Sequence, residues 1–172
     1  MQTNTRTGIY LIAGSAEDHF IGECDRERME EYLEAIWIIL EQGRPLVRVS
    51  WIAKRLSLSM PSVVEMLKSL DARGYVSYTI GEGILLSPKG KAIARRIVRN
   101  HRLMELLMER SIGVPMDEKS ACGFEHHMSE GMAQAICKKL GHPTECLHGQ
   151  KIPTGKDCCN RSDKIQRNQK TR

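Results

Sequence analysis

Apolar residues recur at helical spacing between Asp25 and Gln42. These positions share one side of a helix. They are Met29, Tyr32, Leu33, Ile36, Trp37, Ile39 and Leu40. Gly43 and Pro45 end the pattern, so an amphipathic helix is predicted over residues 25–42. Residues 1–23 form an expected N-terminal extension, in which the apolar run at 9–12 predicts a short strand.

Two shorter helices are predicted after the first one. Residues 49–56 and 60–73 both have the apolar spacing of a helix. Pro61 is suited to the first turn of the second of these helices, and Gly74 ends it. Residues 57–59 leave room only for a tight turn. Two short helices joined in this way predict a helix-turn-helix.

The period of the pattern changes from helix to strand after Gly74. Residues 75–80 are β-branched and aromatic, Gly81-Glu82-Gly83 is typical of a turn, and residues 84–86 can return as a second strand. A hairpin at this place is the wing of a winged helix-turn-helix.

Two longer helices are expected in the rest of the chain. The first is capped by Ser87-Pro88 and runs to about Arg110, and the second covers residues 117–140. The predicted fold is mainly α. An N-terminal winged helix-turn-helix over residues 24–95 is followed by a helical domain over residues 96–153. Residues 154–172 form a polar, basic tail.

The positive charge of the chain is concentrated in its middle. The 172 residues have a net charge of +5, but residues 1–43 carry −6 and residues 44–110 carry +8. A basic block of this kind is typical of a nucleic-acid footprint, although a solvated helical surface explains charge alone equally well. Aromatic residues make up only 5% of the chain, which disfavours proteins that bind single strands by base stacking.

Composition also restricts the compartment. No apolar stretch approaches the ~18 residues of a membrane span, and the N-terminus lacks the features of a secretory signal. We therefore expect a cytoplasmic protein without membrane contact. Six irregularly spaced cysteines occur with six histidines, so in a reducing compartment metal ligation is a better interpretation than a disulfide framework.

Metal-ligating residue types occur at helical spacing on three predicted helices. Cys122, Glu125 and His126 share one helix face. The pairs His101 with Glu105 and Glu31 with Glu34 do the same on two other helices. Each pair alone is more often a set of solvated surface groups. Together they predict a pocket in which a cation offsets the repulsion among the carboxylates.

Five segments resemble one family of regulators. They are MEEYLEAIW (29–37), IAKRLSLSMPSVVEMLKSL (52–70), LLSPKGKAIARRIVRNHRLMELLM (85–108), CGFEHHMSE (122–130) and GHPTECLHGQKIP (141–153). In this order they resemble the diphtheria-toxin-repressor family of iron- and manganese-dependent transcriptional regulators. The resemblance implies a homodimer whose winged helix-turn-helix binds an operator with an inverted repeat. Fe(II) or Mn(II) would bind between the DNA-binding domain and the helical dimerisation and metal-binding domain.

The resemblance also implies a set of metal ligands in this chain. The matching positions are Glu31, Glu34, His101, Glu105, Glu118, Cys122, Glu125 and His126. Cys122 agrees with the iron branch of the family, and Glu34 agrees with the manganese branch. A thiolate favours Fe(II) and the extra carboxylates suit the harder Mn(II), so we expect Fe(II), with Mn(II) as the alternative.

The family often has a third, SH3-like domain, for which this chain is expected to be too short. Cys146 and His148, followed by Cys158 and Cys159, could instead form a second metal cluster holding structural Zn(II) or iron near the C-terminus. The alternative is a set of reduced surface cysteines.

DNA contact is predicted at the start of the second helix of the helix-turn-helix. Residues expected to reach base edges are Ser59, Met60, Pro61, Ser62 and Glu65. Residues expected to contact phosphate are Arg48, Lys54, Lys68 and Lys89.

We expect a metal-activated repressor that is not an enzyme. Two other functional classes are the alternatives. One is a winged-helix zinc or redox sensor that acts through Cys122, Cys158 and Cys159. The other is a di-metal oxidase, which needs two Glu-x-x-His motifs on packed helices, whereas the chain has one, at Glu145 and His148, beyond the helix-ending Pro143.

Overall fold

The structure is a computed structural model that describes the backbone of residues 23–115 and 118–155. Side chains are described in these ranges except at residues 23–24 and 118–122. The strand expected at 9–12 and the tail beyond residue 155 lie outside the described residues. None of the described helices is long and apolar enough to cross a membrane.

The first three helices lie where they were expected, and the second and third form the predicted helix-turn-helix. They are α1 (Glu23–Glu41), α2 (Val49–Leu56) and α3 (Met60–Ala72). Ser57 adopts a left-handed conformation with φ 55° and so ends α2 tightly. The hydroxyl of Ser59 accepts a hydrogen bond from the backbone N–H of Ser62 at 3.3 Å, which caps the start of α3.

The wing is a two-stranded antiparallel hairpin of β1 (Val76–Thr79) and β2 (Gly83–Leu86). Tyr78 pairs with Ile84 in its register. Val47, which precedes α2, forms an isolated bridge to the same Ile84. The hairpin is therefore attached to the entry of the helix-turn-helix.

The helices that follow the wing differ from the prediction in two places. α4 (Pro88–Leu107) passes into a π-helical turn, η2 (Met108–Ile112), which closes at Gly113 with φ 78°. The single helix expected over residues 117–140 is wrong. The chain forms two helices there, α5 (Glu118–His127) and α6 (Glu130–Lys139).

Hydrogen bonds at the junction explain why α5 and α6 are separate. The side-chain amide of Asn100 on α4 donates to the backbone carbonyls of Glu125 and Met128, at 2.9 and 3.2 Å. Ser129 is extended, and its hydroxyl accepts from the backbone N–H of Met132, which caps α6. A buried residue from another helix thus satisfies the end of α5.

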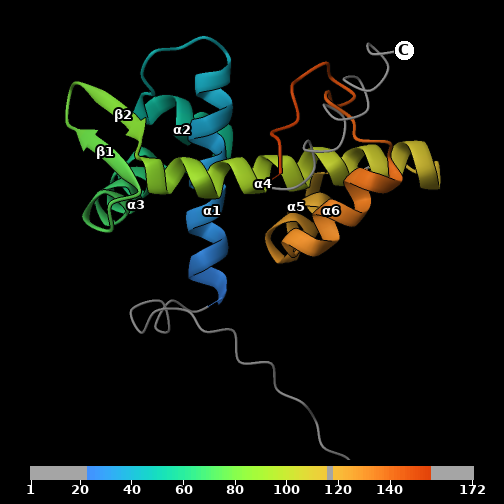
Figure 1. Cartoon of the computed structure of the whole chain (residues 1–172). Coiled ribbons are helices and arrows are strands. Elements are labelled where there is room, and N and C mark those ends of the chain that lie inside the picture. The colour runs from blue at the N-terminus through green and yellow to red at the C-terminus, as the bar shows by residue number, and fades with distance from the viewer. Residues whose placement is uncertain (1–22, 116–117, 156–172) are drawn as a thin grey trace, which may run out of the picture.

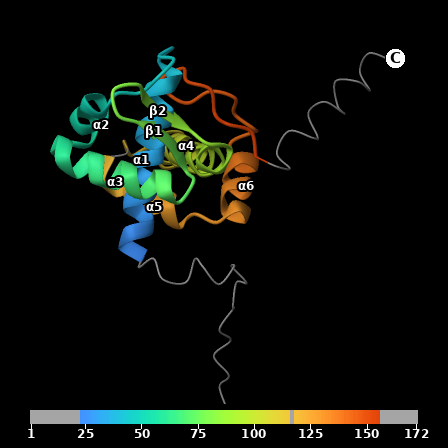
Figure 2. The same ribbon diagram turned by 90° about the vertical axis from the view of Figure 1, so that its left-hand side faces the viewer.

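α4 forms the long axis of the described chain (Figures 1 and 2). One core lies around α1, α2, α3 and the wing and reaches α4 at Ala94. A second core begins on the same helix at Leu103 and includes α6 and the C-terminal arm, residues 141–155, through Cys146 and Ile152. The second core also buries Met128, at the junction of α5 and α6, and Ile136 on α6.

Candidate metal centre and nucleic-acid interface

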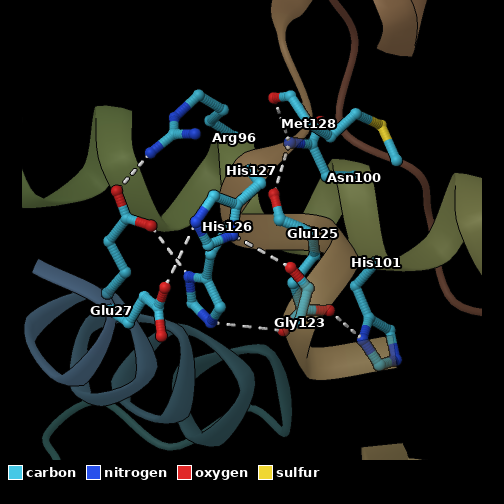
Figure 3. A network of polar contacts seen from close by, with 10 residues as sticks. Glu27, Arg96, Asn100, His101, Gly123, Glu125, His126, His127 and Met128 are labelled. Carbon is cyan, nitrogen blue, oxygen red and sulfur yellow. Dashed lines mark hydrogen bonds and ion pairs between the residues drawn. The ribbon is translucent and has the colours of Figure 1, made fainter. Parts of the chain in front are cut away.

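Three ligand residues from three different helices meet at one place. Glu34 on α1, His101 on α4 and Glu125 on α5 each offer one ligand atom, and these atoms lie within 4.8 Å of one another. We call this group the interdomain cluster. Nδ1 of His101 on α4 is 2.5 Å from Oε2 of Glu125 on α5, and Figure 3 shows these two side chains pointing toward each other.

The interdomain cluster concentrates negative charge in a largely buried place. Burial, followed by the neighbouring charge of Glu125, raises the pKa of Glu34 from 4.5 to about 7. Burial lowers the pKa of His101, but its hydrogen bond to Glu125 and the charges of the nearby carboxylates outweigh burial, so the net shift is upward. The protonated forms of Glu34 and His101, which reduce the local negative charge, are therefore favoured.

The cluster opens into a cavity of about 520 Å³ that also includes Glu31 and Arg55. Glu31 is half-buried and lines this cavity together with Glu34, so both predicted α1 ligands face the same space. Glu118 and Cys122 belong to α5, but their side chains lie outside the described residues.

The donor set of the cluster fits a divalent first-row metal ion. Two carboxylates and one imidazole, gathered within reach of one ion, suit Mn(II) and Fe(II). Glu34, His101 and Glu125 would hold such an ion, and its positive charge would offset the repulsion between the two carboxylates.

His126 lies next to the interdomain cluster rather than within the three-residue group. Its Nε2 is 3.6 Å from Oε1 of Glu125 (Figure 3). Its Nδ1 is 2.8 Å from Oε2 of Glu30. Glu30 was missed by the sequence analysis. A signal was available, because Glu30 directly precedes the Glu31 and Glu34 pair, but helix spacing alone does not show that Glu30 faces inward.

A second ligand group lies beside the first. Glu105, Cys146 and His148 each offer one atom within 4.8 Å of the others, and Nδ1 of His148 is 3.0 Å from Oε1 of Glu105. The sequence analysis placed Glu105 with His101 and grouped Cys146 and His148 with Cys158 and Cys159. The structure instead brings Cys146 and His148 to Glu105, because the C-terminal arm folds back onto α4.

A cavity of about 390 Å³ joins the two groups, since Glu34, His101, Glu105, Cys146 and His148 all line it. Cys158 and Cys159 lie outside the described residues, so their predicted part in this group is not described.

The residues expected to bind DNA lie on the surface of the helix-turn-helix. Exposed positions are Arg48, Lys54, Ser59, Met60, Pro61, Ser62, Glu65 and Lys68. Lys89 is exposed too, but its amine donates to the backbone carbonyl of Arg73 and lies 4.2 Å from the Tyr75 ring centre. The hydroxyl of Ser59 is also engaged, because it caps α3.

One basic feature near the wing was missed. The guanidinium of Arg44 lies 4.0 Å from the ring centre of Trp51, and that of Arg48 lies 5.4 Å from it. This stack adds Arg44 to the basic surface at the start of α2, beside the phosphate-contact candidate Arg48. A Trp near two arginines was visible in the sequence, but their stacking depends on the turn before α2.

A winged helix-turn-helix joined by one long helix to a helical unit with candidate metal ligands is the architecture expected of a metal-sensing, DNA-binding regulator. Two family models match the chain. Residues 26–84 match the iron dependent repressor N-terminal DNA-binding domain, and residues 87–154 match the iron dependent repressor metal-binding and dimerisation domain. The chain belongs to this family, the diphtheria-toxin-repressor family of metal-dependent regulators.

Relatives come from both branches of the family. The HTH-type transcriptional regulator MntR of Geobacillus kaustophilus is 40% identical over 103 residues, which cover 59% of this chain and 72% of MntR. The iron-dependent repressor IdeR of Mycobacterium tuberculosis is 35% identical over 126 residues, covering 72% of this chain and 54% of IdeR. The chain thus spans about half the length of the IdeR relatives.

Solved structures of iron- and manganese-dependent regulators also resemble this chain. The crystal structure of T. acidophilum IdeR superposes with a TM-score of 0.61 at 30% identity, covering 73% of this chain and 60% of that one. A manganese-dependent transcriptional repressor in complex with manganese gives a TM-score of 0.66 at 30% identity, with coverages of 73% and 58%. The family favours metal-dependent regulation over the alternative zinc or redox sensor acting through cysteines.

Proposed function

We propose that this protein is a transcriptional repressor that binds operator DNA as a homodimer when Fe(II), or alternatively Mn(II), occupies the interdomain cluster. One observation carries the proposal. Glu34 lies in the segment that matches the DNA-binding domain, whereas His101 and Glu125 lie in the segment that matches the metal-binding domain. An ion held by all three residues would tie the two parts together.

The switch follows from the charges of the cluster. In the absence of an ion, the carboxylates of Glu34 and Glu125 repel each other, which loosens the contact between α1 and α5. Once Glu34, His101 and Glu125 hold a cation, the winged domain is fixed in one orientation. Metal and DNA must then strengthen each other's binding by the same factor, typically about 5- to 150-fold.

The wider ligand set also belongs to the proposal. Glu31, Glu118, Cys122 and His126 complete the interdomain site, and the thiolate of Cys122 shifts its preference toward Fe(II). Glu105, Cys146 and His148 hold a second ion, for which the thiolate and imidazole suit Zn(II) or Fe(II). Cys158 and Cys159 remain predicted members of this second site.

On the DNA side, we propose that α3 enters the major groove with Ser59, Met60, Pro61, Ser62 and Glu65 near base edges. Arg48, Lys54, Lys68 and Lys89 contact phosphate. A two-fold dimer sets two such helices about one DNA turn apart, or at a multiple of it, so the operator is an inverted repeat. A repressor of this kind acts where the chromosome is, which places it in the cytoplasm.

The test is a metal titration of operator affinity with thiols kept reduced. Operator fragments would be selected from random DNA with the Fe(II)-loaded protein. The unmodified protein should bind them about 5- to 150-fold more tightly with Fe(II) than with a strong chelator.

Glu125→Ala should lose this response and keep its fold, because Glu125 is central to the cluster. Glu109→Ala, which removes an exposed glutamate from η2, is the matched control and should respond normally. Equal operator affinity with metal and with chelator would refute the proposal.

A further inference from the structure

Glu30 is a buried carboxylate with a partner on each oxygen. Only 2% of the residue is exposed. Its Oε1 accepts a hydrogen bond from the guanidinium of Arg96 on α4, and its Oε2 lies 2.8 Å from Nδ1 of His126 on α5. Glu30 is thus placed to act on His126 rather than to ligate an ion in the interdomain cluster.

The contact with Glu30 determines which nitrogen of His126 can bind a metal. A neutral imidazole carries a proton on one ring nitrogen and a lone pair on the other. A carboxylate can only accept a hydrogen bond, so Glu30 selects the form of His126 that carries the proton on Nδ1. The lone pair is then on Nε2, which is 3.6 Å from Oε1 of Glu125 and so faces the cluster (Figure 3).

We propose that Glu30 is a positioning residue, which fixes the tautomer and ring orientation of His126 so that Nε2 is presented to the ion. Arg96 supports this role by offsetting the charge of Glu30 in its buried position. The inference rests on the proposed function, since it gives His126 a place in the interdomain site. Residues that orient a metal-binding histidine typically change metal affinity by about 10- to 100-fold when they are replaced.

The same two helices provide a matched control. Glu27 on α1 lies 3.4 Å from Nε2 of His127 on α5, and these side chains are 36% and 49% exposed. This contact joins α1 to α5 with the same residue types, but on the surface. A loss of metal affinity that results only from weaker attachment of α1 to α5 would therefore appear in Glu27→Gln as well.

The key variant is Glu30→Gln, which keeps the size and shape of the side chain. Arg96 needs an acceptor, so it should take the amide oxygen and turn the amide NH₂ toward His126. His126 must then accept at Nδ1 and carry its proton on Nε2, the wrong nitrogen. We expect Zn(II) affinity, measured by competition with a chromophoric chelator, to fall about 10- to 100-fold in Glu30→Gln. It should stay unchanged in Glu27→Gln.

A second substitution separates positioning from simple structural support. In Glu30→Gln/Arg96→Met the amide no longer has to face Arg96, so its oxygen can turn to His126 and restore the correct tautomer. The side chain of Arg96 is 35% exposed, and Met lacks its guanidinium, so we expect water to take the place of the guanidinium beside the freed amide NH₂. Positioning predicts a partial recovery of Zn(II) affinity, whereas a purely structural ion pair predicts a further loss.

The unmodified protein offers a direct readout. In the Zn(II)-loaded form, histidine ¹⁵N NMR should show zinc on Nε2 of His126 and a proton on Nδ1. Zinc on Nδ1, no zinc on His126, or unchanged Zn(II) affinity in Glu30→Gln would overturn the inference. Failure of the proposed function looks different, because operator affinity would then ignore metal although this NMR pattern is present.

Discussion

At the scale of single residues, Glu34 is a carboxyl group whose negative charge is made unfavourable by the fold. Burial and the neighbouring Glu125 raise the pKa of Glu34 to about 7, so near neutral pH its charged form is disfavoured by the fold. In the proposed metal site a cation would reverse this preference, because ligation requires the carboxylate. Glu34 would thereby convert the binding of metal into a change in local stability.

The upward pKa shifts predict that the metal-free protein loses stability as pH rises. Protonated Glu34 contributes stability that is complete below about pH 4.5 and is lost as pH rises through about 7. The raised pKa of His101 has the same sign, with stability present below its usual 6.5 and lost above its folded value. The thermal midpoint of chelator-treated protein should therefore fall between about pH 5 and 8.

Two comparisons check this pH prediction. Glu125→Gln removes a charge that raises both pKa values, so its midpoint should depend less on pH. With Mn(II) bound, the midpoint should instead rise with pH, since the ion competes with protons for Glu34 and His101. A metal-free midpoint that rises over this range would contradict the assignment.

Gly90 occupies a position where the fold leaves no room for a Cβ atom. A Cβ there would lie 2.0 Å from the backbone carbonyl oxygen of Tyr75, where the first turn of α4 packs against the start of the wing. Gly90→Ala should lower the free energy of unfolding by roughly 2–4 kcal/mol in urea titrations, in the upper range for overpacking. Gly131→Ala in α6 meets no atom within 4 Å and should be neutral or slightly stabilising.

At the scale of elements, the N-terminal end of α3 holds both its capping residue and the residues proposed to contact DNA. Its capping hydroxyl, Ser59, holds the helix start, and the exposed residues that follow are free for a duplex. The hydroxyl of Ser62 lies 2.8 Å from that of Ser59, so the two serines form one polar group at the tip of α3. The proposed recognition of DNA is therefore coupled to the stability of α3 at this tip.

Two substitutions on α3 should affect DNA binding differently. Lys68→Ala removes an exposed cation, so it should weaken binding to operator and random DNA alike and lower the slope of log affinity against log salt by about 1. Ser62→Ala should mainly change sequence preference. Fluorescence anisotropy over a salt series measures both effects. Identical effects of the two variants on both DNAs would argue against this orientation of α3.

At the scale of the whole molecule, the helical unit leaves apolar side chains uncovered. Ile112, Val114, Phe124 and Met132 are 57%, 47%, 59% and 48% exposed. Ile112 lies in η2, Phe124 in α5 and Met132 in α6, and Val114 comes just after η2. All four belong to the part of the chain that matches a dimerisation domain. We expect a second copy of the chain to cover these residues in the proposed homodimer.

Replacing one of these residues should separate the dimer from the metal site. Phe124→Asp places a charge on the apolar surface, so light scattering at micromolar concentration should show a monomer where the unmodified protein shows a dimer. Zn(II) binding to the interdomain cluster should persist, because its three ligands come from one chain. A dimer of unchanged stability in Phe124→Asp would exclude this surface as the interface.

The sequence by itself determined the order and type of most elements. The apolar spacing of α1, α2 and α3, the strand pattern of the wing and the cap at Ser87 are local signals, and local signals act within a few residues. The ligand types at Glu34, His101 and Glu125 were also readable, because helical spacing places such residues on one face. The break between α5 and α6 was not readable, since it depends on Asn100 from another helix.

Only the tertiary structure decided how the ligands divide into groups. Spacing along α4 pairs His101 with Glu105, yet the packing of α1 and α5 draws His101 to one group and the returning arm draws Glu105 to another. The inward position of Glu30 was decided in the same way, by Arg96 and His126 from helices distant in sequence. A helix period specifies which side chains share a face, but the partner that each face meets depends on contacts between distant segments.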